Sequence, residues 1–272
     1  MVPAYRTKDE YAVSTFLFED VALEEALKAI AEEGFTRVEL WGDIVHLDPR
    51  MNPDNKQVAR LLRALGLHAH ALHTPFRRFQ IFADEHEGRA WREQLWKRSL
   101  DIASELEVPV AVIHAMNRNE YNYGYDQVAY LQELLARLYA YALSRGVTLA
   151  VENIPSGKQR TDEVLCTLAE QVKLFANVPD VHWCLDIGHV TITSNDMQGE
   201  IDACIDKLVT LHIHNNDGLA DSHDIPTKGV IDWPHWYDYL RSNGYEGTFV
   251  LEVHKGKDPF GRLKKLAGMF EG

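Results

Sequence analysis

Short apolar segments alternate with helical segments along the whole chain, and this alternation is typical of a parallel sheet with crossover helices. We predict eight strands, which are AVSTF (12–16), RVELW (37–41), HAHALH (68–73), VAVIH (110–114), TLAVEN (148–153), HWCLD (182–186), VTLHIH (209–214) and TFVLEV (248–253). The chain has 272 residues, and one (β/α)8 barrel needs about 250. We therefore predict an α/β fold with a single (β/α)8 TIM barrel domain over residues 1–272. A doubly wound open sheet is the alternative, because periodicity cannot show that strand eight pairs with strand one.

The predicted helices carry apolar stripes and end at glycines. Apolar residues spaced i, i+4 and i+7 cover 23–30, with Asp20 before them as the expected N-cap and Gly34 after them as the expected C′ residue. Similar stripes precede Gly66 and Gly146. The connections contain no Ser/Gly-rich linker and no block of charge. The pattern therefore offers no boundary at which to divide the chain.

Charge, cysteine content and hydropathy narrow the class of protein. The formal net charge is -13, from 41 acidic and 28 basic residues, which disfavours nucleic acid as a partner. We find no signal peptide pattern and no apolar run long enough to span a membrane, so we expect no membrane role and a cytoplasmic location. Cys166, Cys184 and Cys204 are odd in number and widely spaced, which predicts reduced core thiols. Nothing in the sequence decides the oligomeric state, and a homo-oligomer is compatible with it.

Residue types that bind metals stand where the apolar strands end. A buried carboxylate or imidazole is unfavourable unless it is paired or bound to a metal, whereas the C-terminal mouth of a barrel is where such enzymes hold their active sites. Six strands end in this way, at His73, His114, Glu152, Asp186, His214 and Glu252. The recurrence predicts a metal site at the barrel mouth.

The loops that follow strands six and seven add three more donors, His189, Asp221 and His223. Nine donors are enough for one to three divalent ions. Nitrogen and carboxylate donors without paired thiolates favour zinc or manganese over a structural thiolate site or a calcium site.

Each histidine also has a structural interpretation, since a single histidine at a strand end is more often hydrogen-bonded than metal-bound. By period-two alternation, His68 and His70 face away from His73 and are expected to pack toward the helices. His212 shares the face of His214 but lies one layer deeper. We therefore expect His212 to support the site and to replace His214 as a ligand if the register is different.

Four other residues near the predicted mouth have two interpretations each. Glu39 is either a mouth residue or the partner of an arginine. Trp41 either forms a wall of the ligand pocket or packs in the core. Arg77, beside Arg78, either binds a phosphate or carboxylate of the substrate or is a solvated surface charge. Asn153, next to a predicted ligand, either donates to the substrate or has a structural role.

These residues resemble the xylose isomerase-like barrels, a group that includes isomerases and epimerases of sugars and sugar phosphates and the endonuclease IV type of apurinic endonuclease. The likeness covers most of the chain. It is carried by VELW (38–41), HTP (73–75), IH (113–114), VEN (151–153), CLDIGH (184–189), HIHNND (212–217), DSH (221–223), KGVIDW (228–233) and LEV (251–253).

The resemblance implies two different ligand sets. For the epimerase branch it implies one metal ion and a histidine that reaches the substrate, and the matching residues are Glu152, Asp186, His214 and Glu252 for the metal and His189 for the substrate. For the endonuclease branch it implies three zinc ions, whose additional ligands match His73, His114, Asp221 and His223. The acidic charge of the chain favours a small substrate over DNA.

We therefore hypothesise a metal-dependent isomerase or epimerase of a small sugar, sugar phosphate or sugar acid. Carboxylates end strands five and eight, so Glu152 and Glu252 are expected to flank one metal and to move a proton through an enediolate. His189, Arg77, Asn153 and Trp41 are the expected substrate-binding residues. The alternatives are a multinuclear zinc hydrolase of phosphoesters and a protein that binds metal and sugar without turnover.

Overall fold

Eight parallel strands form a closed barrel in the computed structural model, which describes residues 7–43, 45–77, 80, 84–114, 127–155 and 167–271. Strands β1 and β8 pair through Tyr11 with Phe249 and Val13 with Leu251. This pairing confirms the (β/α)8 barrel and excludes the doubly wound alternative. The strands are β1 (Tyr11–Ser14), β2 (Arg37–Trp41), β3 (His68–His73), β4 (Val110–His114), β5 (Thr148–Glu152), β6 (His182–Asp186), β7 (Leu208–Ile213) and β8 (Thr248–Leu251).

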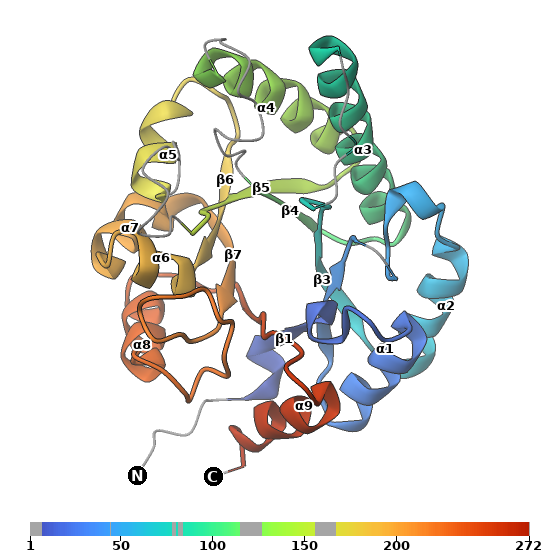
Figure 1. Cartoon of the computed structure of the whole chain (residues 1–272), viewed down its shortest axis with the longest axis vertical. Helices are drawn as coiled ribbons and strands as arrows, with labels where there is room; N and C mark the ends of the chain where they lie inside the picture. Colours follow the sequence, from blue (N-terminus) through green and yellow to red (C-terminus); the bar gives the residue numbers. More distant parts are fainter. Residues whose placement is uncertain are drawn as a thin grey trace.

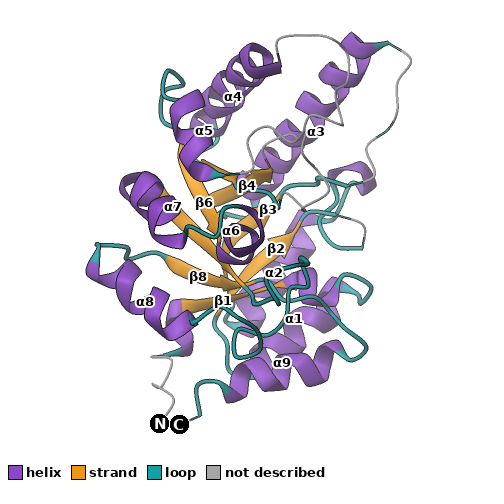
Figure 2. Cartoon of the chain, turned by 60° about the vertical axis from the view of Figure 1, so that its left-hand side comes forward, coloured by secondary structure: helices purple, strands orange, loops and turns teal. Residues whose placement is uncertain are grey.

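The helices lie outside the strands and surround the barrel (Figures 1 and 2). Among the described helices, none combines the length and the apolarity that a membrane span requires. The α-helices are α1 (Leu23–Glu32), α2 (Asn55–Leu65), α3 (Glu85–Glu105), α4 (Gln127–Ser144), α5 (Leu168–Leu174), α6 (Ile187–Thr193), α7 (Met197–Cys204), α8 (Trp233–Ser242) and α9 (Pro259–Gly268). Short 3-10 turns are η1 (Lys8–Glu10), η2 (Thr15–Phe18), η3 (Pro49–Met51) and η5 (Ile205–Lys207).

The predicted C-terminal ends of the helices at glycines are confirmed, and one predicted N-cap is wrong. Gly34, Gly66 and Gly146 have φ values of 79°, 67° and 70°, a region that only glycine adopts without strain. Asp20 is not the N-cap of α1, because the residue before that helix is Ala22. The Asp20 carboxylate accepts a hydrogen bond from Lys255 Nζ at 2.8 Å instead.

Apolar residues pack on both faces of the barrel wall, in its interior and between the strands and the helices. Small side chains form the inner cluster, which includes Ala71, Val112, Ala150 and Cys184. A much larger cluster packs between the strands and the helices. Cys184 and Cys204 are free and buried, as predicted, and Cys166 lies outside the described residues. The small inner residues leave space above them for the polar side chains at the strand ends.

A β-bulge brings His70 into the barrel interior and overturns the prediction that it faces the helices. The pairing of β2 with β3 moves from Val38–Ala69 to Glu39–Ala71, so His70 is an extra residue and the alternation is interrupted there. His70 Nε2 lies 3.1 Å from Thr210 Oγ1 on β7, the strand opposite β3 in the barrel. The contact therefore crosses the barrel interior.

The half-buried position of His70 inside the barrel makes the stability of the fold sensitive to acid. Burial, followed by the charges of Arg37 and His212, lowers the pKa of His70 to about 4. Because the unfolded chain protonates first, at about 6.5, stability is lost as the pH falls from about 6.5 through 4. Between pH 7 and 5 we expect the free energy of unfolding of the wild type to fall by about 2 kcal/mol more than that of His70→Gln.

Urea unfolding at the two pH values measures this difference. His68→Gln is the matched control, because His68 is exposed at the start of the same strand and its replacement should leave the acid dependence unchanged. Equal losses of stability in the wild type and His70→Gln would contradict the prediction.

Candidate metal centre and active site

The predicted donor residues all meet at the C-terminal rim of the barrel. Parallel strands in a closed barrel end on the same side, so side chains that are far apart in the sequence become neighbours there. The rim residues at the ends of their strands are His73 on β3, His114 on β4, Glu152 on β5 and Asp186 on β6, and Glu252 follows the last residue of β8. These five side chains, which are far apart in the sequence, therefore lie at one end of the barrel.

Glu152 is the hub of the first group. Its Oε2 atom lies 3.1 Å from Nε2 of His73 and 3.1 Å from Nε2 of His114. Its Oε1 atom lies 3.0 Å from Nδ1 of His212. The Glu152 side chain is 1% exposed, so these polar contacts are almost sealed from water. A buried carboxylate with three imidazoles around it is an arrangement that can bind a metal ion.

His212, and not His214, lies between the catalytic carboxylates that we predicted. Its Nδ1 atom is 3.0 Å from Glu152 Oε1 and 3.3 Å from Glu252 Oε2. One donor atom from each of Glu152, Asp186, His212 and Glu252 lies within 4.8 Å of the others. His212, the residue that the sequence allowed as a substitute, thus lies among these carboxylates, and His214, the ligand that the resemblance implies, contacts one of them, Asp186, at 2.9 Å.

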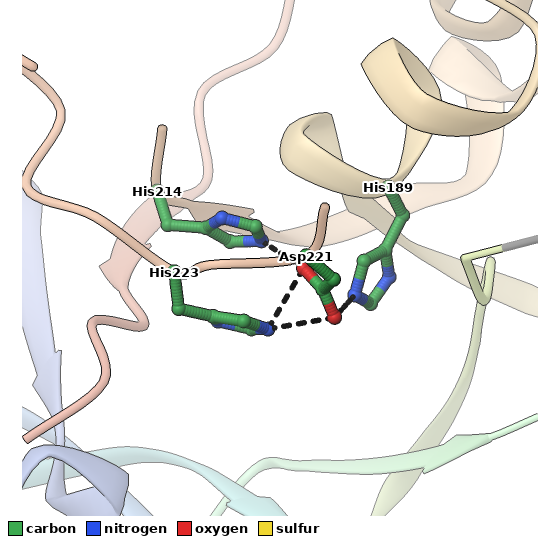
Figure 3. A group of neighbouring side chains, drawn as sticks. All are labelled: His189, His214, Asp221 and His223. Atoms are coloured by element: carbon green, nitrogen blue, oxygen red, sulfur yellow. Dashed lines mark hydrogen bonds and ion pairs between the residues drawn. The ribbon is translucent and has the colours of Figure 1, made fainter. Parts of the chain in front are cut away.

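His214 belongs to a second group, with His189, Asp221 and His223 (Figure 3). Asp221 is its centre, with Oδ2 at 3.3 Å from His189 Nε2 and Oδ1 at 3.2 Å from His223 Nε2. The rings of His214 and His223 stack at 3.7 Å with an interplanar angle of 17°. Four donor atoms of this group also lie within 4.8 Å of one another, so it can bind a second ion.

Asp186 connects the two groups and its position is fixed from several sides. His214 Nε2 lies 2.9 Å from Asp186 Oδ1, and the same carboxylate caps α6 by accepting a hydrogen bond from the His189 backbone N–H. The amide of Asn153 bonds to both the N–H and the carbonyl of Asp186. Both ends of the Asn153 side chain are thus engaged, as expected for the structural interpretation of that residue.

Gly188 makes room for the ring of His214. A Cβ atom at this position would lie 1.9 Å from Cε1 of His214, which is far inside van der Waals contact. The glycine of CLDIGH is therefore required by the packing of the second group and not by a turn.

Three histidines present the same nitrogen to the site. Nδ1 of His73 lies 2.9 Å from the carbonyl of Thr74, Nδ1 of His189 lies 2.8 Å from that of Asn153, and Nδ1 of His223 lies 2.9 Å from that of Glu252. Because a carbonyl only accepts hydrogen bonds, each Nδ1 must carry the proton. Each Nε2 then faces a carboxylate with the orientation that metal ligands need.

The imidazole and carboxylate charges in the first group offset the unfavourable effect of burial on the ionised carboxylates. Burial would raise the pKa of Glu152, but the charges of His212 and His114 and their hydrogen bonds hold it well below its usual value. In the same way His212, followed by His223, lowers the pKa of Glu252 to about 2 in spite of burial. Both carboxylates are therefore ionised at neutral pH.

The second group has the same balance of charge. Burial opposes ionisation of Asp221, yet His189 and His223 lower its pKa far below the usual range. Burial also opposes protonation of His223, and Asp221 nevertheless raises its pKa to about 9. The pKa of His189 is raised well above its usual value by Asp186 and Asp221, again against burial. These carboxylates need positive charge beside them, which protons or a cation can supply.

Aromatic side chains and one arginine line the rim next to His73 and His114. The Trp41 ring lies 4.8 Å from that of His73, and the Phe76 ring stacks on His114 at 3.9 Å. The Arg77 guanidinium lies 4.9 Å from the centre of the Phe76 ring and 5.6 Å from that of Trp41. Its side chain is 40% exposed and pairs with Glu19 at 3.2 Å. Arg78 lies outside the described residues.

Glu39 is the site residue that the sequence reasoning did not assign. It is fully buried on β2, and its Oε2 atom lies 2.9 Å from Nε2 of His212. A carboxylate in the apolar strand RVELW was the available signal, since such a group needs a buried partner. The sequence could not say that the partner is a histidine of β7 rather than an arginine.

Comparisons with known proteins agree with the fold. The family model described as xylose isomerase-like TIM barrel matches residues 27–271. The chain is 25% identical to fructoselysine 3-epimerase of Escherichia coli O157:H7 over 85% of both chains. It is similar in structure to D-psicose 3-epimerase from Clostridium cellulolyticum, with a TM-score of 0.74, 17% identity and coverage of 94% of this chain and 96% of that one. A family 2 AP endonuclease from Brucella melitensis has a TM-score of 0.72 and 22% identity, with coverage of 94% and 97%.

Proposed function

Because the chain belongs to the family of xylose isomerase-like TIM barrels, we propose that it is a metal-dependent isomerase or epimerase of a small sugar, sugar phosphate or sugar acid. The observation that carries the proposal is the convergence of two carboxylates, Glu152 and Glu252, on Nδ1 of His212. The relative named fructoselysine 3-epimerase supports the same class of reaction.

The donor set fits a divalent cation. Glu152, Asp186 and Glu252 are three buried carboxylates with donor atoms within 4.8 Å of one another, and like charges this close are unfavourable without a cation between them. With His214, whose Nε2 atom lies 2.9 Å from Asp186 Oδ1, they would hold the ion, and carboxylate and imidazole donors favour zinc or manganese. A bound ion would polarise the substrate carbonyl and orient its neighbouring oxygen.

In our proposal Glu152 and Glu252 act as the acid and base pair. Both are ionised at neutral pH, so either can accept a proton from the carbon beside the substrate carbonyl. Ionised Glu152 takes the proton from one face and leaves an enediolate. Glu252, which first takes up a proton from water, gives that proton to the opposite face, so the pair ends with Glu152 protonated and Glu252 ionised. Return to the opposite face inverts the carbon, which is epimerisation, and return to the neighbouring carbon is isomerisation.

His189 is the proposed hydrogen-bonding partner of the substrate. The Asn153 carbonyl fixes the position of its ring, and its Nε2 atom faces Asp221 in the second group at the barrel mouth. Trp41 would form the floor beside His73. The 1% exposure of Trp41 supports a role in holding that histidine as well.

Arg77 is the proposed partner of an anionic group on the substrate. Because a guanidinium binds phosphate and carboxylate oxygens with paired hydrogen bonds, Arg77→Met is expected to raise KM for a sugar phosphate or sugar acid by about tenfold, with little change in KM for the neutral sugar. Steady-state kinetics with the two substrates side by side measure the difference. An equal effect on both substrates would favour the alternative, a surface arginine paired with Glu19.

Proton exchange tests the proposed reaction directly. The metal-loaded protein is incubated in D2O with ketoses and their phosphates, and deuterium at the carbon next to the carbonyl is followed by NMR. Incorporation together with formation of the epimer or isomer supports the proposal. Complete absence of exchange across ketoses, ketose phosphates and sugar acids would contradict it.

A multinuclear zinc hydrolase of phosphoesters is the second candidate, because His189, Asp221 and His223 form a separate group of donors beside the first. Several ions in one site can generate hydroxide and stabilise the displaced oxygens. More than one tightly bound zinc per chain, with cleavage of bis-p-nitrophenyl phosphate or abasic DNA and no proton exchange, would favour it over the epimerase. The net charge of -13 opposes DNA as the substrate.

A further inference from the structure

Arg50 is a mostly buried arginine that joins the segments following β2 and β3 at the barrel mouth. Its Nη1 atom donates to the backbone carbonyl of Arg77 at 3.2 Å. Its Nε atom lies 2.7 Å from Oδ1 of Asp48, and its Nη2 atom donates to Oδ1 of Asp43. The side chain of Arg50 is 21% exposed, and those of Asp43 and Asp48 are 1% and 6% exposed. One planar guanidinium thus contacts two carboxylates of its own segment and a carbonyl of the next.

The local sequence directs the Arg50 side chain. Asp48 is the N-cap of η3, whose first residue is Pro49, and its carboxylate accepts a hydrogen bond from the Arg50 N–H at 2.9 Å. The same carboxylate binds Nε of Arg50, so the backbone and the side chain are held together. Earlier in this segment, Nδ1 of His46 lies 3.1 Å from Oγ1 of Thr15, which follows β1. The segment after β2 is therefore a fixed base from which Arg50 reaches its neighbour.

The segment that is held in this way carries side chains next to the proposed site. The ring of Phe76 stacks on that of His114 at 3.9 Å. The Arg77 guanidinium lies 4.9 Å from the centre of the Phe76 ring and 5.4 Å from that of Phe16, and a cation over aromatic faces is attracted by them. All these contacts depend on where the backbone of residues 76 and 77 lies.

Stability alone is a weak reason for the cluster of Arg50, Asp43 and Asp48. Removing a cation and two carboxylates from water is unfavourable, and well-packed apolar side chains in the same place are often as stabilising. A guanidinium adds direction, because its donors lie in one plane and bind oxygens at fixed angles. The cluster is therefore better suited to fixing the Arg77 carbonyl than to strengthening the fold.

We propose that Arg50 is a positioning residue that fixes the backbone of Arg77 and so holds the Arg77 guanidinium where an anionic group of the substrate binds. The inference rests on the role of Arg77 in the proposed function. Arg50 acts through the Arg77 backbone and has no assigned contact with the substrate. Discrimination between a sugar phosphate and the neutral sugar then depends on a residue of the neighbouring segment.

Limited proteolysis tests the contact without any substrate. Trypsin cleaves after arginine, and the carbonyl that Arg50 binds belongs to the peptide bond after Arg77. Loss of this hydrogen bond should let the segment open, so we expect Arg50→Gln to increase the rate of cleavage after Arg77 by about tenfold. Mass spectrometry of the fragments, at a temperature well below the Tm of each protein, measures the rate.

Arg241→Gln is the matched control for this experiment. Arg241 is 18% exposed, and like Arg50 it contacts a carboxylate and a backbone carbonyl, those of Glu10 and Tyr245, in another part of the barrel. Its replacement should leave the rate of cleavage after Arg77 unchanged. If Arg50→Gln does not fold, Arg50→Lys provides the same test, because lysine keeps the charge beside the two carboxylates but has no planar fork of donors.

Steady-state kinetics test the consequence for substrate selection. We expect Arg50→Gln to lower the ratio of kcat/KM for a sugar phosphate to kcat/KM for the neutral sugar by about fivefold. In a protein with both Arg50→Gln and Arg77→Met, the ratio should equal that of Arg77→Met alone. Such non-additivity is expected when one residue acts through the other.

Three results would overturn the inference. The first is an Arg50→Gln protein that is cleaved after Arg77 at the wild-type rate. The second is a ratio that falls further in the double variant than in Arg77→Met. The third is an equal loss of kcat/KM for both substrates together with a lower Tm, which indicates a purely structural role.

The outcome is separable from that of the proposed function. Faster cleavage after Arg77 in Arg50→Gln, with no proton exchange by the wild type, would support the hold of Arg50 on Arg77 and contradict the epimerase. Unchanged cleavage in Arg50→Gln, with normal proton exchange in the wild type, would overturn only the role of Arg50.

Discussion

Glu152→Gln is expected to lower the turnover of sugar isomerisation by about 10³-fold, within the range for loss of a general base. The substitution removes the base and also a charged metal ligand. Glutamine is nearly the same size as glutamate, so the volume of the side chain is kept. What changes is the negative charge of the group that contacts His212, His73 and His114. Initial rates with saturating metal and substrate measure the effect.

Glu252→Gln separates the two roles in the proton transfer. If Glu152 removes the proton and Glu252 returns it on the other face, Glu252→Gln still exchanges the substrate proton with D2O but forms little epimer. Glu200→Gln, a buried glutamate away from the mouth, should keep the wild-type rate. Full turnover in Glu152→Gln would contradict the assignment of the pair.

Removal of the metal is expected to abolish turnover and to destabilise the fold. Because a ligand that binds only the native state stabilises it, restoring the ion at a concentration of about 1,000 Kd should add about 4 kcal/mol. For a chain of this size that corresponds to a rise in Tm of roughly 10 °C. Calorimetry on chelator-treated protein, with and without added Mn²⁺ or Zn²⁺, measures this difference.

Two histidine variants show which of the two groups of donors binds the ion that stabilises the fold. His214→Ala should remove most of the metal-dependent rise in Tm, since its Nε2 atom lies 2.9 Å from Asp186 Oδ1. His223→Ala should keep most of that rise, because its Nε2 atom faces Asp221 in the second group. Chelator-treated protein that retains full turnover would contradict metal dependence altogether.

Much of the fold follows from local patterns in the sequence. The bounds of β2, β3, β4 and β6 are those predicted, because short apolar runs between polar turns have few alternatives. The glycine stops are equally local, since only glycine adopts a positive φ without strain. The rim position of the strand-end donors follows as well, because parallel strands end on one side.

Tertiary structure alone decided which donors share a site. Period-two alternation gives the face of a side chain but not its depth, so it could not choose between His212 and His214. Bulges interrupt the alternation at β3 and at β7, which is why His70 lies inside the barrel. Glu39 and His212 are 173 residues apart, and Asp20 and Lys255 are 235 apart. Contacts at such separations depend on barrel closure and strand register, which come from the packing of the whole chain and leave no local signal in the sequence.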